Sequence, residues 1–203
     1  MKIQAEYKNA GTSVGLQTDD YKSLFVTQSG KYQQAALGGR MFFSYCAARA
    51  TSVPATAQIG NIIYNPPTSG VNLIMAKWNA QVQVTSATCL GFTFGTSAQL
   101  TTPTTTTVAD ASGSTLLNPP GMTASTNGVL AYAIATIVTA PVPVFLMGHN
   151  TAAINTVGVD HIEGDFDGMF IVPPGNVVAI SAITAAVAAA GMTSTLTWIE
   201  ELV

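Results

Sequence analysis

Apolar and polar residues alternate with a period of two along most of the chain after residue 40. The clearest stretch is 74–85, where apolar side chains occupy the even positions and Lys, Asn, Gln and Thr follow Met75 at the odd positions. Successive side chains of a strand point to opposite faces. The pattern therefore predicts a half-buried strand with Ile74 and Trp78 on its core face.

Further strands are predicted wherever apolar residues share one face of an extended segment. These faces carry Met41, Phe43, Tyr45 and Ala47; Leu90, Phe92 and Phe94; Phe166, Phe170 and Val172; and Leu196 and Trp198. Proline-containing turn signals end several apolar runs, as in 65–67, 118–121 and 173–176. About eight short strands with such turns predict an all-β, jelly-roll-like antiparallel β-sandwich over residues 40–203. The threonine-rich segment 101–107 is either an exposed loop or a β-bulged edge.

Residues 1–39 lack a sustained period and are rich in Gly, Gln, Ser and Lys. We interpret them as an extended N-terminal arm with a short helix near 30–37. No apolar run of the signal-peptide kind occurs at the start of the chain, so we expect assembly in a cytoplasm. The uncharged stretch 128–148 contains two prolines and alternates as a strand, which argues against a membrane span. We expect no membrane partner.

Charge is scarce in this chain. Hydrophobic residues make up 48% of it, but charged residues make up only 8%, against about 25% in an average soluble domain. The apolar content excludes a disordered chain. The weakly charged polar surface is unusual for a cytosolic enzyme and is expected where other subunits cover it. The composition therefore predicts a homo-oligomer.

The few charges are also segregated along the sequence. All seven basic residues lie in the first 77 positions, which carry a net charge of +4, while the remaining 126 residues carry −7. One interpretation is a basic arm that docks on an acidic surface; the other is compositional drift on a solvated segment. The basic residues are spread out, so we expect no nucleic-acid partner.

Four of the ten acidic residues fall between positions 160 and 167. Three interpretations are open: a solvated acidic turn, a contact with a neighbouring subunit's basic arm, or a site for a hard cation such as Ca²⁺. The EF-hand ligand spacing is not met. The candidate partner-contact residues are Lys2, Lys8, Lys22, Lys31, Asp160, Glu163, Asp165 and Asp167.

No residue pattern points to catalysis. The two cysteines and two histidines lack ligand spacing, and we expect Cys46 and Cys89 to be free, buried thiols. The match of 11–15 to the G-x-S-x-G elbow has no buried strand before it. Glu200 and Glu201 are adjacent, so they should point to opposite faces of a solvated strand end. We predict a protein that is not an enzyme and has no catalytic, cofactor or metal site.

Two segments resemble known proteins. Residues 65–74, Asn-Pro-Pro-Thr-Ser-Gly-Val-Asn-Leu-Ile, resemble the turn-into-strand of jelly-roll virion proteins from tailed bacteriophages. Residues 170–180, together with Thr-Trp-Ile-Glu-Glu at 197–201, resemble the closing hairpin of the same class. The resemblance implies a virion protein without catalytic residues: a trimeric capsid decoration (cement) protein or a small fibre knob.

Three functions follow from this resemblance. The first is a homotrimeric decoration protein that binds the major capsid protein or another virion protein and stabilises the outer shell. The alternative is a fibre or knob domain that binds a host receptor or glycan, and a weaker alternative is a major coat protein. In each case the expected location is the virion.

Overall fold

The computed structural model describes residues 8–9, 12–13, 32–84, 91–114, 124–149, 158–183 and 190–203. The chain divides into two units, residues 1–34 and 35–203. In the first unit, β1 (Lys8–Asn9) and β2 (Thr12–Ser13) pair in antiparallel orientation. The short helix expected near 30–37 is α1 (Gln33–Leu37), so that prediction is confirmed.

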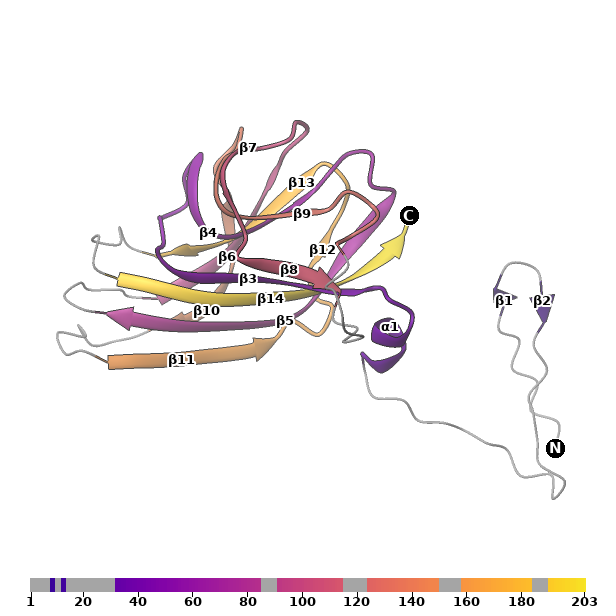
Figure 1. Ribbon diagram of the computed structural model, residues 1–203, viewed down its shortest axis with the longest axis horizontal. Coiled ribbons are helices and arrows are strands. Elements are labelled where there is room, and N and C mark those ends of the chain that lie inside the picture. Colours follow the sequence, from indigo (N-terminus) through magenta and orange to yellow (C-terminus); the bar gives the residue numbers. More distant parts are fainter. Residues whose placement is uncertain are drawn as a thin grey trace, which may run out of the picture. The chain divides into compact units, whose positions relative to one another are not determined.

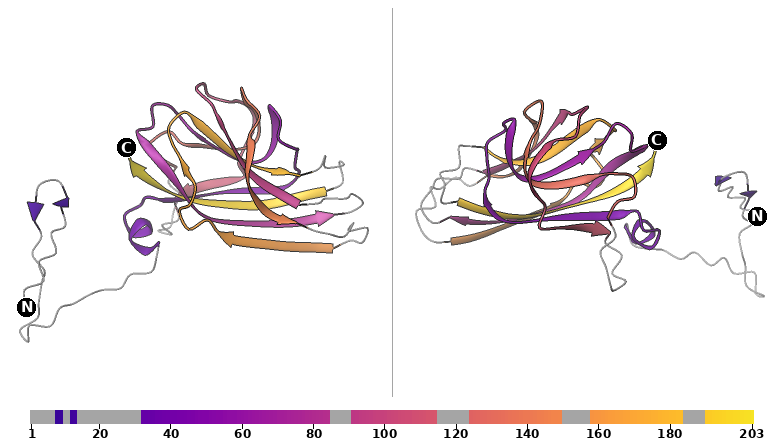
Figure 2. Two further views of the ribbon diagram at one scale, coloured as in Figure 1. Left: turned by 180° about the vertical axis from the view of Figure 1, so that it is seen from behind. Right: turned by 45° about the horizontal axis from the view of Figure 1, so that its top comes forward.

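The second unit is a sandwich of two antiparallel sheets (Figures 1 and 2). The first sheet contains, in order, β10 (Val142–His149), β6 (Gly91–Ala98), β13 (Asn176–Ala182), β4 (Ala57–Asn65), β9 (Leu130–Thr136) and β7 (Thr104–Val108). The second contains β11 (Gly158–Asp165), β5 (Val71–Val84), β14 (Ala190–Leu202), β3 (Met41–Ala50) and β8 (Ala111–Ser114), and β12 (Ile171–Val172) also pairs with β5. The all-β prediction is confirmed.

The strand connections define a jelly roll. Four antiparallel pairs join strands from opposite ends of the chain: β3 with β14, β4 with β13, β5 with β11, and β6 with β10. This is the pairing of one long eight-stranded ribbon. The ribbon folds so that its outermost pair, β3 and β14, lies inside the second sheet (Figure 1). The result is the double Greek key of the jelly roll.

An insertion between β6 and β10 extends both sheets. Its strands β9 and β7 continue the first sheet beyond β4, and β8 continues the second sheet beyond β3. The threonine-rich segment forms β7, an edge strand whose pairing with β9 shifts register twice between Thr105 and Val108. Of the two interpretations left open for this segment, the bulged edge is therefore confirmed.

A β-bulge in β5 changes which residues face the core. Thr197 of β14 pairs with Lys77, but the next residue, Trp198, pairs with Met75, so Ala76 is the extra residue. Before the bulge the odd positions are buried and after it the even ones, Trp78 among them. The core position of Trp78 is confirmed. The prediction for Ile74 is wrong, because the bulge places it on the outer face.

The predicted apolar face of β3 is the outer one. Phe42, Ser44 and Cys46 are buried between the sheets, whereas Tyr45 is 38% exposed. The inner face is partly polar because Asn61 of β4 crosses the sandwich here. Ser44 Oγ donates to Asn61 Oδ1 at 2.5 Å, and Asn61 Nδ2 lies 3.2 Å from Ser44 O and 3.3 Å from Ser194 O.

The other apolar faces follow the prediction where the structure describes them. Phe94 and Phe166 pack at 4.8 Å between ring centroids, and Phe166 and Phe170 at 5.3 Å. Trp198 is 3% exposed, in line with the prediction. Leu90 and Cys89 lie outside the described residues. Among the described helices, none is long and apolar enough to cross a membrane.

Candidate functional site

The outer face of the second sheet presents side chains in rows across the strands. One row runs through Glu163 on β11, Asn79 on β5, Thr195 on β14 and Tyr45 on β3. The neighbouring row contains Asp165, Lys77, Thr197 and Phe43, paired across the same four strands. Residues opposite each other in a ladder share a face, so these two rows form one continuous surface.

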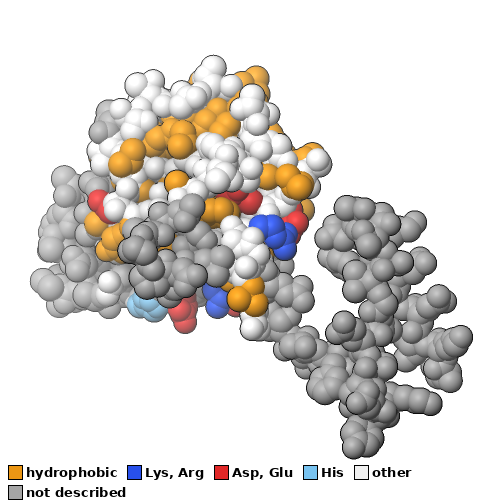
Figure 3. Space-filling view, turned by 45° about the vertical axis from the view of Figure 1, so that its right-hand side comes forward, with side chains coloured by type: hydrophobic (Ala, Val, Ile, Leu, Met, Phe, Trp, Pro, Cys, Tyr) orange, Lys and Arg blue, Asp and Glu red, His pale blue; other side chains and the backbone are white. Residues whose placement is uncertain are grey.

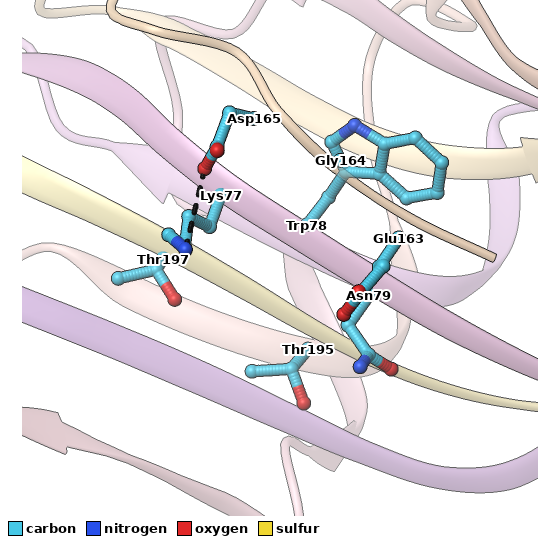
Figure 4. A pocket seen from close by; sticks show the side chains of 8 residues that line it. All are labelled: Lys77, Trp78, Asn79, Glu163, Gly164, Asp165, Thr195 and Thr197. Atoms are coloured by element: carbon cyan, nitrogen blue, oxygen red, sulfur yellow. Dashed lines mark ion pairs between the residues drawn. The ribbon is translucent and has the colours of Figure 1, made fainter. Parts of the chain in front are cut away.

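The polar members of both rows surround a hollow of about 400 Å³ (Figure 4), called the sheet-face hollow below. Its polar lining consists of Lys77, Asn79, Glu163, Asp165, Thr195 and Thr197. Lys77 Nζ lies 3.5 Å from Asp165 Oδ1, and both side chains remain about half exposed at 56% and 47%. Such an exposed ion pair contributes roughly 0–1 kcal/mol to stability, so its groups remain available to a ligand.

Trp78 and Gly164 form the inner wall of the hollow. They are opposite each other in the β11–β5 ladder, and the indole of Trp78 covers the glycine. A Cβ atom at Gly164 would lie 2.9 Å from three atoms of the indole ring. The glycine therefore lets the indole pack against the edge strand, which fixes β11 beside β5.

The acidic patch of the sequence forms one side of this surface. Asp160, Glu163 and Asp165 belong to the edge strand β11, and only Asp167, with φ of 53°, lies in the turn that follows. The interpretation as a solvated turn is therefore wrong for most of the patch. In Figure 3, acidic and histidine side chains lie along this lower edge of an otherwise weakly charged surface. His161 Nε2 lies 3.6 Å from Glu163 Oε2.

Two further interpretations of the acidic patch at 160–167 were a cation site and a contact with a basic arm. Among the described residues, no group of three or more His, Cys, Asp or Glu side chains could hold a metal ion. The contact with a basic arm stays a prediction. Lys8 lies in β1, and Lys2, Lys22 and Lys31 lie outside the described residues, as does the side chain of Asp160.

A second hollow is lined by both glutamates near the end of β14, Glu200 and Glu201. Glu200 and Glu201 point to opposite faces, as predicted, but Glu200 is only 3% exposed. It accepts hydrogen bonds from Asn127 Nδ2 at 2.6 Å, Ser125 Oγ at 3.1 Å and Trp198 Nε1 at 3.3 Å. The expectation of a solvated strand end is therefore wrong for Glu200. Its role is to anchor segment 124–129 against β14.

Glu201 lies on the solvent side of the same strand and pairs with Arg40. Both side chains of this pair are 44–45% exposed. The two adjacent glutamates thus provide a matched comparison between a buried, hydrogen-bonded carboxylate and an exposed ion pair.

We expect Glu200→Ala to lower the free energy of unfolding by about 1–3 kcal/mol, because three side-chain donors lose their acceptor. Glu201→Ala should cost at most about 1 kcal/mol, since an exposed ion pair contributes little. Urea denaturation of both variants at one protein concentration measures the difference. Equal losses would show that the buried network does not stabilise the fold.

Apolar side chains also reach the surface along the edge strand β10. Val142, Val144 and Leu146 are 61%, 46% and 52% exposed. Pro143 and two register shifts interrupt the pairing of β10 with β6. Bulges and proline protect a sheet edge from pairing with another strand. A partner at this edge would therefore contact side chains rather than extend the sheet.

Two further side chains, Cys46 and Tyr132, are buried. Cys46 is buried, as expected, and its thiol donates to Ala47 O at 3.7 Å. Burial raises the pKa of Tyr132 above 10.0, and a hydrogen bond with Thr105 acts in the opposite direction. No protein-family model, curated protein or solved structure matches the chain.

Proposed function

We propose that the chain is a structural virion protein that assembles into a homo-oligomer, in particular a trimer, and decorates the outer shell of a capsid. The observation that carries this proposal is the jelly roll itself, with its weakly charged surface and the exposed aliphatic row on β10. Double-sheet jelly rolls are common building blocks of viral shells. The resemblance of 65–74 and 170–180 to phage virion proteins supports the same class.

The surface chemistry supports assembly. Burying uncharged side chains such as Val142, Val144 and Leu146 against a neighbouring subunit requires no desolvation of an ion. Apolar burial is favourable by about 25 cal/mol per Å². The polar strand faces, rich in Thr, Asn and Gln, can be covered in the same way. The low charge content is therefore an advantage for a protein that is surrounded by other subunits.

The basic arm supplies a contact to the capsid in this proposal. The arm would pair its lysines with acidic groups of the shell or of a neighbouring subunit; these lysines are Lys2, Lys8, Lys22 and Lys31. The acidic patch at 160–167 of a neighbouring subunit is one such surface. Ordering a backbone costs about 1–2 kcal/mol per residue, so we expect a partner surface to contribute to the free energy of ordering an arm with little apolar material.

Two measurements test the proposal on the full chain. Light scattering at micromolar concentration should give a mass well above the 20.9 kDa of one chain. Replacing the four arm lysines by glutamine should abolish co-sedimentation with purified phage capsids, while the melting temperature stays unchanged. Attachment of the unaltered chain should also weaken between about 0.1 M and 1 M salt, because screening shortens the range of charge–charge attraction.

A scattering mass of one chain would contradict the assembly. Co-sedimentation of the glutamine variant at the strength of the unaltered chain would show that the arm is not the anchor. If the unaltered chain does not bind capsids at all, the decoration role is wrong. Lys77→Gln, which removes a basic charge outside the arm, is the control for non-specific charge effects.

A further inference from the structure

We propose that the sheet-face hollow binds a neutral oligosaccharide. This inference goes beyond the proposed virion role and does not depend on it, because it concerns the exposed face of one sheet. It locates the glycan-binding alternative at named residues: Asn79, Thr195, Thr197, Glu163 and Tyr45.

The floor of the hollow carries polar groups that are free to bind. Asn79, Thr195 and Thr197 are half-buried, and none of their side chains has a hydrogen-bond partner within the described part of the chain. The threonine hydroxyls both donate and accept, and the Asn79 amide does the same through separate atoms. Vicinal hydroxyl groups of a sugar ring match this mixture of donors and acceptors.

The charged side chains favour a neutral sugar. The hollow is lined by one ammonium group, Lys77, and by two carboxylates, Glu163 and Asp165, and Lys77 already pairs with Asp165. An anionic sugar would therefore approach a net negative charge. Glu163, on the rim and 72% exposed, can accept from a sugar hydroxyl in a charge-assisted hydrogen bond.

The shape of the surface fits a short chain of sugars. The row Glu163–Asn79–Thr195–Tyr45 crosses four neighbouring strands, which places its ends about 14 Å apart at the usual strand spacing. Tyr45 closes the row with an exposed aromatic ring. The apolar face of a sugar ring can pack on such a ring, while the phenol group remains solvated.

The strands that carry these groups are held firmly. Lys77 and Asn79 on β5 and Thr195 and Thr197 on β14 belong to strands that are paired on both sides. Figure 4 shows that the side chains from β5, β11 and β14 converge on the same hollow. A preformed polar surface loses little conformational freedom when a ligand binds.

Titration calorimetry with di- to tetrasaccharides of glucose, galactose, mannose and N-acetylglucosamine tests the proposal. At least one neutral series should bind the unaltered full chain, and a sialylated trisaccharide should not. Thr195→Val, which replaces the hydroxyl by a methyl group of similar size, should weaken binding about fivefold, the effect of losing a hydrogen bond of about 1 kcal/mol. Tyr45→Ala should weaken it further.

Thr136→Val is the matched control, because this exposed threonine lies on β9 of the other sheet. It should bind the sugar like the unaltered chain. The proposal is overturned if no neutral sugar binds, or if Thr195→Val retains full affinity while its melting temperature is unchanged. It is also overturned if Tyr45→Ala dissociates the oligomer, since the face would then be a subunit interface. None of these outcomes depends on capsid binding.

Discussion

Trp198→Ala is expected to lower the free energy of unfolding by about 3–5 kcal/mol, the usual range for truncating a buried large aromatic side chain. Trp198 is 3% exposed and stacks on Phe42, with ring centroids 6.0 Å apart and planes inclined by 21°. Its indole N–H also donates to Glu200 Oε1 at 3.3 Å. The substitution therefore removes a packing contact and one donor to the buried carboxylate at the same site.

Trp198→Phe separates these two contributions. It keeps an aromatic ring against Phe42 but has no donor for Glu200, so it should lose clearly less stability than the alanine variant. Equilibrium urea denaturation measures both variants, at equal protein concentration because an oligomer's stability depends on concentration. An alanine variant as stable as the unaltered chain would mean that Trp198 does not lie in the core.

The period-two alternation was sufficient to predict the all-β fold, because a half-buried strand exposes one face to water. It could not assign every face. In β5 the bulge at Ala76 changes the buried positions from odd to even. Apolar residues of this strand on the two sides of the bulge therefore face the core from positions of opposite parity. A bulge depends on how a partner strand pairs, and this partner, β14, lies more than 100 residues further along the chain.

The polar residues in the core were missed for a different reason. Asn61, Gln58 and Asn65 are fully buried, although such side chains are usually exposed. Asn65 Nδ2 donates to Val71 O at 2.9 Å and to Val172 O at 3.0 Å. Both acceptors of Asn65 are backbone carbonyls of other strands, which no local sequence pattern reveals. These three side chains thus stabilise the interior rather than covering the surface.

The candidate site was predicted only in part. The acidic residues of 160–167 and the polar face of 77–85 were both recognised, but as separate features. Their union in the sheet-face hollow results from the β11–β5 pairing, which sets Glu163 opposite Asn79. The outward position of Tyr45 completes the surface. That position follows from the burial of Phe42, Ser44 and Cys46 on the other face of β3 and contradicts the simple hydrophobic pattern.

Gly60→Ala should be among the most damaging single substitutions in the sandwich. Gly60 lies in β4 where its pairing with β9 shifts register, and it has a φ of 146°. An added Cβ atom would lie 2.5 Å from the backbone oxygen of Ile180, so strands β4 and β13 would have to move apart. The steric overlap and the unfavourable φ together predict a loss of about 2–5 kcal/mol.

Gly70→Ala is the control for a positive φ without a steric overlap. Gly70 also has a positive φ, 67°, but an added Cβ atom there would meet nothing within 4 Å. It should therefore lose only the conformational cost of about 1–2 kcal/mol. Urea denaturation of both variants compares them directly, and a larger loss for Gly60→Ala measures the combined effect of the close approach of Ile180 and of the φ of 146°. Equal losses would show that β13 can shift to accommodate the methyl group. The close approach of β4 and β13 at Gly60 would then not restrict the side chain at this position.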